Sequence, residues 1–147
     1  MDNISVLEKT ADCVDTMLRR NTSIRRLRLR NAGIGDRSLI KISKGIAEHP
    51  TLGELDLSNN VFENEGLEHL INAIRHTGTL KSLHFANLDI NIENATKLAD
   101  FVEKSHIWEL ALKEVEVDHE SLKKIIHGCT KGPYLRVLDF NGTPIGP

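Results

Sequence analysis

Glycines between two patterned stretches are the first residues in this chain of 147 that could support chemistry. Gly33 and Gly35 follow an alternating apolar stretch and precede a helical pattern, as in a loop that holds a dinucleotide phosphate. That loop needs a third glycine for close packing, and Ser38 stands in its place. The pattern therefore predicts an ordinary turn and not a nucleotide site.

Other catalytic and metal-binding patterns fail on spacing. The seven histidines show neither HExxH nor another metal-ligand spacing, and no GxxxxGK[ST] phosphate loop occurs. Cys129 and His127 are two residues apart in a helical pattern, so they point in different directions and form no nucleophile–base pair. No Ser/His/Asp set can be nominated from the sequence. We therefore expect a protein that is not an enzyme and has no cofactor and no metal.

Residues 51–78 define the structural unit that the rest of the chain repeats. Leu55 and Leu57 alternate as in a half-buried strand, and Leu67, Leu70 and Ile74 then follow helical spacing. One strand and one helix cannot bury this apolar surface alone, so the unit needs copies beside it. The strand leucines return at intervals of 27 or 28 residues, at Leu27, Leu55, Leu83, Leu110 and Leu138.

The repeats predict a single domain over residues 1–147. Repeats start near residues 23, 51, 79, 106 and 134, the last of them incomplete, and residues 1–22 form an amino-terminal capping helix. Its inward positions are Leu7, Ala11, Val14 and Leu18. Asp36, Asn64 and Asp118 are expected to cap the amino termini of later helices, since short polar side chains accept hydrogen bonds there.

The segment TLGELDLSNNVF fits the pattern L-x-x-L-x-L-x-x-N-x-h and resembles the leucine-rich repeat in its long, ribonuclease-inhibitor-like form. The resemblance implies a right-handed α/β solenoid with five parallel strands on the concave face and five helices on the convex face. The turn asparagine of the family is present only as Asn60, and Ala32, Leu88, Val115 and Thr143 take its equivalents. Those turns lose a side chain that would satisfy buried backbone groups, so we expect a less regular solenoid, with the third and fourth repeats the most deviant.

The resemblance also implies a class of function, because most members of this family bind other proteins. We expect a non-catalytic module that binds a protein partner through the concave face. The alternatives are an actin-capping module resembling the tropomodulin repeats, and a regulator or activator of a GTPase or another enzyme.

Residues at equal repeat positions form ladders across a parallel sheet, about 4.8 Å apart. The ladders nominate the protein-binding residues Arg26, Arg28, Arg30, Glu54, Asp56, His84, Trp108, Glu109 and Lys113. The arginines of the first strand suit an acidic partner. In the alternative interpretation Glu54 answers Arg26 and Asp56 answers Arg28, on a solvated strand. Nucleic-acid binding or nuclear localisation is a third interpretation, disfavoured because no aromatic residue is interleaved.

Two residues of this set keep a second interpretation. Trp108, the single tryptophan, is either an interface anchor or a cover for the preceding turn. His84 either reports pH or is a bystander.

Composition restricts the partners and the compartment. The formal charge of −2 argues against a general binder of polyanions, and no apolar run approaches the ~18 residues that a membrane span needs. The first residues lack a secretory signal, and Cys13 and Cys129 are expected to be free thiols too far apart to pair. We therefore expect a cytoplasmic protein. The last strand should expose an open edge, explained by a longer solenoid, by the Gly/Pro tail folding over it, or by a partner or a second copy that pairs there as an added strand.

Overall fold

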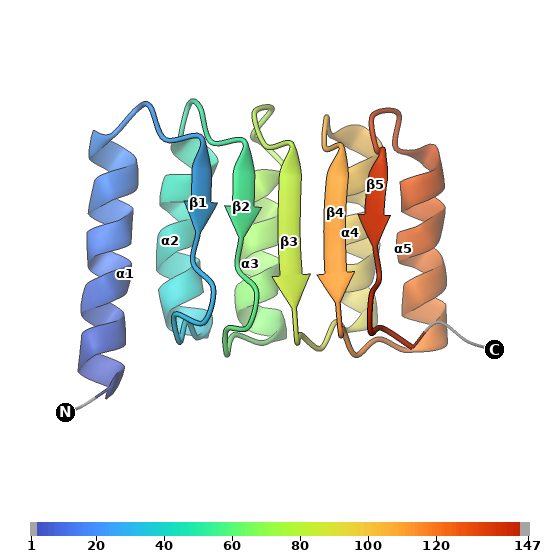
Figure 1. Ribbon diagram of the computed structural model, residues 1–147, viewed down its shortest axis with the longest axis horizontal. Coiled ribbons are helices and arrows are strands. Elements are labelled where there is room, and N and C mark those ends of the chain that lie inside the picture. The colour runs from blue at the N-terminus through green and yellow to red at the C-terminus, as the bar shows by residue number, and fades with distance from the viewer. Residues whose placement is uncertain (1–2, 145–147) are drawn as a thin grey trace.

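A computed structural model describes residues 3–144 of the chain, with side chains from residue 11 onward. Helices and strands alternate along it (Figure 1). The helices are α1 Asn3–Arg20, α2 Asp36–Glu48, α3 Asn64–Ile74, α4 Ile92–Lys104 and α5 His119–Lys131. The strands are β1 Arg26–Arg28, β2 Glu54–Asp56, β3 Ser82–Ala86, β4 Glu109–Lys113 and β5 Val137–Asp139.

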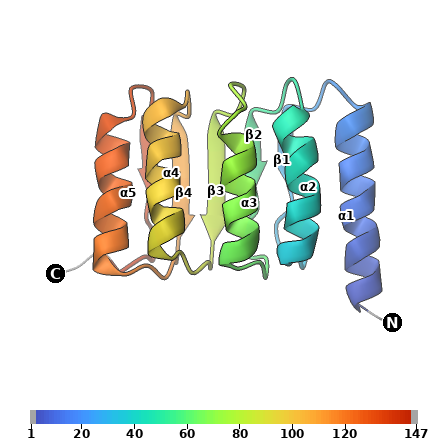
Figure 2. The same cartoon turned by 180° about the vertical axis from the view of Figure 1, so that it is seen from behind.

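The strands form one parallel sheet in the order β1-β2-β3-β4-β5. The helices make a second layer that covers one side of the sheet, as Figure 2 shows from behind. The predicted rungs are confirmed, because Leu27 pairs with Leu55, Leu55 with Leu83, Leu83 with Leu110 and Leu110 with Leu138. The fold is therefore the predicted α/β solenoid.

The core lies between the two layers. Strand leucines face it from one side, and the stripes at three- and four-residue spacing, such as Leu39, Ile42 and Ile46, face it from the other. Leu110 is 0% exposed but Leu138 is 39% exposed, because β5 pairs only with β4. The side chain of Leu7, predicted to point inward, lies outside the described side chains.

The predicted caps are correct only at Asp118, whose carboxylate accepts a hydrogen bond from Ser121 N at 2.7 Å. Asp36 lies inside the first turn of α2 and caps the next helix instead, accepting from Glu63 N and Gly66 N, each at 2.8 Å. A Cβ atom on Gly66 would lie 2.6 Å from this carboxylate, so the contact requires glycine.

The prediction for Asn64 is wrong in the same way. Its Oδ1 accepts from Asn91 N at 3.0 Å and from Asn94 Nδ2 at 2.9 Å, both in the following repeat. Asn91 itself caps α4, accepting from Asn94 N. Polar side chains at the amino termini of the helices in this chain therefore cap helices and also join neighbouring repeats.

Asn60 satisfies the turn that follows β1 and β2. Its Oδ1 accepts from Ala32 N at 3.0 Å and Ile34 N at 3.1 Å, and its Nδ2 donates to Leu29 O at 2.8 Å and Leu57 O at 2.9 Å. One amide thus holds two consecutive repeats together.

The prediction that these turns lack a side chain to satisfy their backbone groups is wrong at Thr143. Thr143 is buried, accepts from Val115 N at 3.0 Å and donates to Leu112 O at 2.7 Å. Where Leu88 replaces the asparagine, its carbonyl accepts from Glu116 N at 2.8 Å, beside a bridge between Asp89 and Glu116. The third and fourth repeats do differ, because β3 and β4 are longer and their turns are joined by backbone alone.

A residue with left-handed backbone follows the strand in each repeat. Asn31, Asn59, Asn87, Glu114 and Gly142 have φ of 53°, 59°, 57°, 51° and 77°. Asparagine and glycine tolerate this conformation, whereas a glutamate is strained in it. The ladder of left-handed residues reverses the chain at the carboxyl-terminal edge of the sheet.

Candidate functional site

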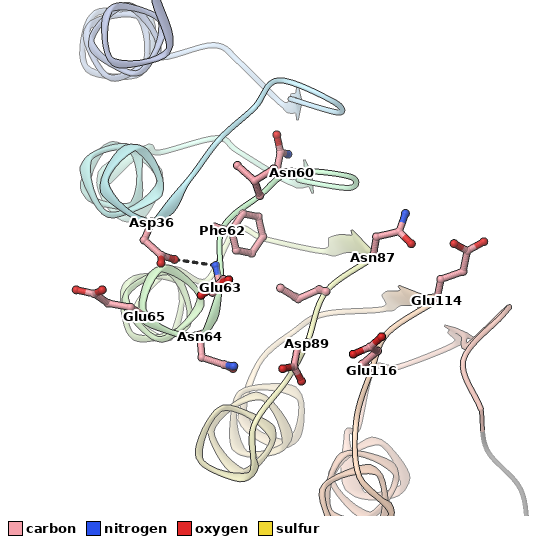
Figure 3. A pocket seen from close by; sticks show the side chains of 12 residues that line it. Asp36, Asn60, Phe62, Glu63, Asn64, Glu65, Asn87, Asp89, Glu114 and Glu116 are labelled. Carbon is pink, nitrogen blue, oxygen red and sulfur yellow. Dashed lines mark hydrogen bonds between the residues drawn. The ribbon is translucent and has the colours of Figure 1, made fainter. Parts of the chain in front are cut away.

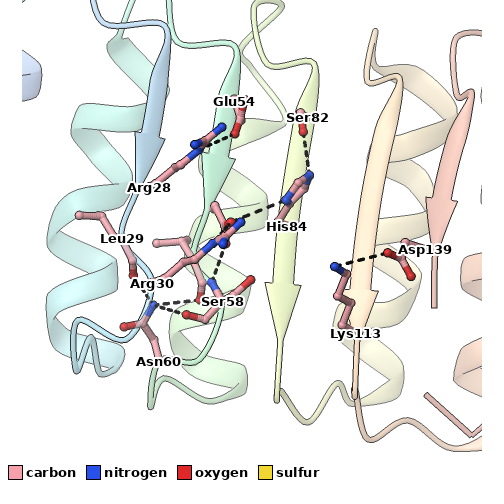
Figure 4. A network of polar contacts seen from close by, with 12 residues as sticks. Arg28, Leu29, Arg30, Glu54, Ser58, Asn60, Ser82, His84, Lys113 and Asp139 are labelled. Carbon is pink, nitrogen blue, oxygen red and sulfur yellow. Dashed lines mark hydrogen bonds and ion pairs between the residues drawn. The ribbon is translucent and has the colours of Figure 1, made fainter. Parts of the chain in front are cut away.

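The outward side chains of β1–β5 form the open face of the sheet, which carries a ladder of cross-strand ion pairs (Figure 4). Arg26 Nε lies 3.5 Å from Glu54, as expected, and Arg28 Nε lies 2.9 Å from the same carboxylate. The expectation that Asp56 answers Arg28 is wrong, because Asp56 pairs with Arg30. Arg26 thus pairs with the residue of its own rung, whereas Arg28 and Arg30 reach diagonally to a carboxylate two residues earlier in the register.

Asp56 is the buried anchor of this ladder, with a side chain that is 0% exposed. Its carboxylate accepts from Ser58 N at 3.0 Å and from the guanidinium of Arg30. Burial alone would raise the pKa of Asp56, but the hydrogen bonds from Ser58 and the charge of Arg30 outweigh burial and hold that pKa below its ordinary value. Asp56 is thus charged at neutral pH and fixes Arg30.

His84 links β2 to β4 through two carboxylates. Its Nε2 lies 2.6 Å from Glu109 Oε1 and its Nδ1 lies 3.7 Å from Asp56 Oδ2. Ser82 Oγ donates to the same oxygen of Glu109 at 2.6 Å. Hydrogen bonds from Ser82 and then from His84 lower the pKa of Glu109, more than its partial burial raises it.

This cluster brings Ser82 beside His84 and Asp56, a serine, histidine and aspartate that the sequence did not nominate as a catalytic set. Ser82 Oγ lies 3.0 Å from His84 Nε2, the distance expected for a nucleophile and its base. A base nitrogen must accept the serine proton, however, and here Nε2 faces the Glu109 carboxylate, which only accepts. Ser82 is also buried. The cluster therefore orders the open face instead of activating a nucleophile.

The remaining predicted residues lie at two other places. Lys113 reaches Asp139 on β5 at 3.5 Å and extends the ion-pair ladder. Trp108, just before β4, is 43% exposed and lies at the amino-terminal edge of the sheet, apart from the network. It lines a hollow with Tyr134 and His106, which sequence reasoning missed although each lies two residues before an equivalent position in adjacent repeats.

The opposite, carboxyl-terminal edge carries an acidic groove of about 710 Å³ (Figure 3). Its acidic side chains are Asp36, Glu63, Glu65, Asp89, Glu114 and Glu116. Asp36 and Glu65 lie in the first turns of α2 and α3, where a carboxylate stabilises the positive end of the helix dipole. Asp36 is already engaged in capping α3, so the groove is at least partly structural.

Several negative findings apply to residues 3–144. Among the described side chains, which begin at residue 11, no three of the metal-binding types lie together, and no helix of the described chain has the length and apolar character of a membrane span. Cys13 is exposed and Cys129 is buried, both as free thiols, and burial raises the pKa of Cys129 to about 11. Cys129 is therefore an inert core residue at neutral pH.

Comparison with known proteins agrees with this geometry. Residues 20–43 and 48–70 match the leucine-rich repeat family model. The tropomodulin C-terminal domain of Caenorhabditis elegans superposes with a TM-score of 0.79 and 11% identity, covering 91% of this chain and 84% of that one. Leiomodin-1 Actin-Binding Site 2 superposes with a TM-score of 0.75 and 10% identity, covering 95% of this chain and 81% of that one. At such identities the likeness shows a shared fold. Together with the repeat register, the matches show that the chain has the leucine-rich repeat fold in its ribonuclease-inhibitor-like form.

Proposed function

We propose that this chain is a non-catalytic module that binds a protein partner through the open face of its sheet, inside the cell. The observation that supports it best is the cross-strand network, in which Glu54 and buried Asp56 orient exposed arginines and half-buried Glu109 orients His84. Side chains that are ordered before binding lose little entropy on docking. The two free thiols suit a reducing, intracellular compartment.

The chemistry of the face favours an acidic partner. Arg28 and Arg30 are held through their Nε atoms, and both side chains are more than half exposed. Their terminal nitrogens contact no other described side chain, so they keep donors for a carboxylate of the partner. Arg25, next to the same strand, is exposed and pairs with no carboxylate among the described side chains.

Peptides selected from a random display library against the folded chain provide the test. Their affinity should fall for Arg26→Gln/Arg28→Gln and hold for Lys123→Gln/Lys124→Gln, which removes the same charge from exposed positions of α5. Melting curves should be nearly superimposable, since exposed ion pairs contribute only ~0–1 kcal/mol. Equal affinity for both double variants would exclude the arginines of the open face as the binding site.

A second candidate partner is actin, favoured by the shared fold with a leiomodin-1 structure described as an actin-binding site. The superpositions cover 91% and 95% of this chain and so extend far beyond one motif. Sedimentation of the chain with actin filaments, and capping of filament growth, would test this candidate. Absence of binding to both filaments and monomers would remove it while leaving the general proposal intact.

A further inference from the structure

A hollow of about 530 Å³ opens at the amino-terminal edge of the sheet, where β3, β4 and β5 begin. Its lining combines two aromatic and three basic side chains, Lys81, His106, Trp108, Tyr134 and Arg136. In Figure 1 this edge is the upper end of the three strands. Trp108 and Tyr134 are 43% and 50% exposed, a large apolar area for a surface that faces water.

The repeat register builds this hollow from two rows. Lys81, Trp108 and Arg136 occupy equal positions in successive repeats, since Trp108 N bonds to Lys81 O and Arg136 N to Trp108 O, each at 2.8 Å. Two residues earlier, the rings of His106 and Tyr134 pack with centroids 4.7 Å apart. Each side chain therefore projects from a backbone that the sheet holds in place.

The cations of the hollow differ from those in the ion-pair ladder of the open face. Arg28, Arg30 and Lys113 each face a carboxylate. No ion pair joins Lys81 or Arg136 to any carboxylate between residues 11 and 144, and Lys81 Nζ reaches only the carbonyl of Gly78, at 3.3 Å. Helix dipoles favour cations in a last helical turn. Lys81 and Arg136 precede strands instead of ending helices, so a helix dipole does not account for the presence of these two cations without a carboxylate partner.

We propose that this hollow binds an acidic peptide segment of the protein partner, with an apolar side chain packed on Trp108 and Tyr134 and carboxylates facing Lys81 and Arg136. Tryptophan, tyrosine and arginine are the residues that most often dominate binding energy at interfaces. The two unpaired cations supply the charge complementarity. This inference rests on the proposed function, because it assigns the chemistry of one segment of the same partner.

Aromatic rings beside cations also suit a single-stranded nucleic acid. The peptide is favoured because the His106 and Tyr134 rings already face each other, which leaves less ring surface for stacked bases. The chain is also acidic overall, with a net charge of −2. Nucleic acid is therefore a competing outcome of the test.

Trp108 is the only tryptophan, so intrinsic fluorescence reports on this hollow alone. The full chain is titrated with an acidic peptide that has a central leucine, with the same peptide carrying serine there, and with a single-stranded oligonucleotide. We expect saturable change with the leucine peptide and about tenfold weaker binding of the serine peptide and the oligonucleotide, which corresponds to 1.4 kcal/mol. Equal binding of the serine peptide, tighter binding of the oligonucleotide, or no saturation with any probe would overturn the proposal.

The variants separate this site from the open face. Lys81→Gln/Arg136→Gln should weaken the leucine peptide about tenfold, whereas Lys123→Gln/Lys124→Gln, matched in charge, should leave its affinity unchanged. Arg26→Gln/Arg28→Gln should also leave it unchanged. Circular dichroism checks that each variant is folded. This inference fails, while the proposed function stands, if the library peptides lose affinity for the open-face variant but the leucine peptide binds Lys81→Gln/Arg136→Gln as tightly as the unaltered chain. The proposed function fails by itself if the library peptides keep their affinity for the open-face variant.

Discussion

Replacing Asn60 with alanine tests how the repeats are joined. The substitution removes two accepted and two donated hydrogen bonds, at 2.8–3.1 Å; three of them connect the turn after β1 to the turn after β2, and the fourth, to Leu57 O, lies within the second turn. A typical hydrogen bond contributes ~1 kcal/mol net, and a donor or acceptor left unpaired in the interior costs ~1–3 kcal/mol. Because Asn60 is only half-buried, water replaces some of these bonds. We therefore expect Asn60→Ala to lower the free energy of unfolding by about 2–4 kcal/mol.

Urea unfolding followed by circular dichroism measures this loss. The control is Asn72→Ala, an exposed asparagine within α3, for which we expect a change within about 0.5 kcal/mol. Thr143→Val keeps the shape and removes two bonds, so its cost should be about half that of Asn60→Ala. If Asn60→Ala matched Asn72→Ala, the amide would not be what joins these repeats, and the reasoning from bond count would be refuted.

Four further predictions concern the core, the turns, the carboxylates and the sheet edge. Leu55→Ala should cost ~2–5 kcal/mol through a core cavity and leave peptide specificity unchanged among folded molecules, as measured by urea unfolding and peptide titration. Glu114→Asn should raise stability by ~1 kcal/mol in thermal melts, because φ is 51° there and asparagine tolerates this conformation better than glutamate. An unchanged melting temperature would show that the backbone at Glu114 is not strained. Asp56 and Glu109 have folded pKa values below their ordinary ones, so their stabilisation is present above about pH 4 and is lost as pH falls through the folded pKa; Glu109→Gln should flatten this acid decline in urea titrations. The exposed edge of β5 predicts self-association that sedimentation velocity should detect and Leu138→Asp should abolish, and a wild-type monomer at every concentration would rule it out.

The fold could be predicted because the repeat is encoded in the spacing of apolar residues. Leu27 and Leu55 must occupy the same rung once each unit needs its neighbours to bury its strand. The turns were harder to predict, since the same backbone groups can be satisfied in different ways. Thr143 uses a hydroxyl in place of the amide, and the turn at Leu88 uses a backbone bridge. Residue type at a single position does not distinguish these solutions.

The sequence predicted which residues of the candidate site align across neighbouring strands, but not which side chains contact each other. Equal repeat positions placed Arg26 beside Glu54, which the structure bears out. The diagonal pair of Arg30 with Asp56 depends on side-chain length and direction, which the ladder alone does not contain. Tyr134 was missed because it lies outside the strand ladders from which the site was predicted, and its role depends on the His106 ring packed beside it.

The internal pairing of the open face restricts how that face can bind. Glu54 and Asp56 already pair with the arginines, so a carboxylate of the partner adds less interaction energy than it would with free arginines. Affinity at the open face therefore depends on how well the partner fits the preordered donors. At the amino-terminal edge, Lys81 and Arg136 face no competing carboxylate among the described residues. An acidic segment of the partner therefore gains the full energy of its ion pairs with these two cations. Salt screens exposed charges. A partner that spans both places should therefore owe its shape specificity to the open face and most of the salt dependence of its affinity to the two cations at the edge.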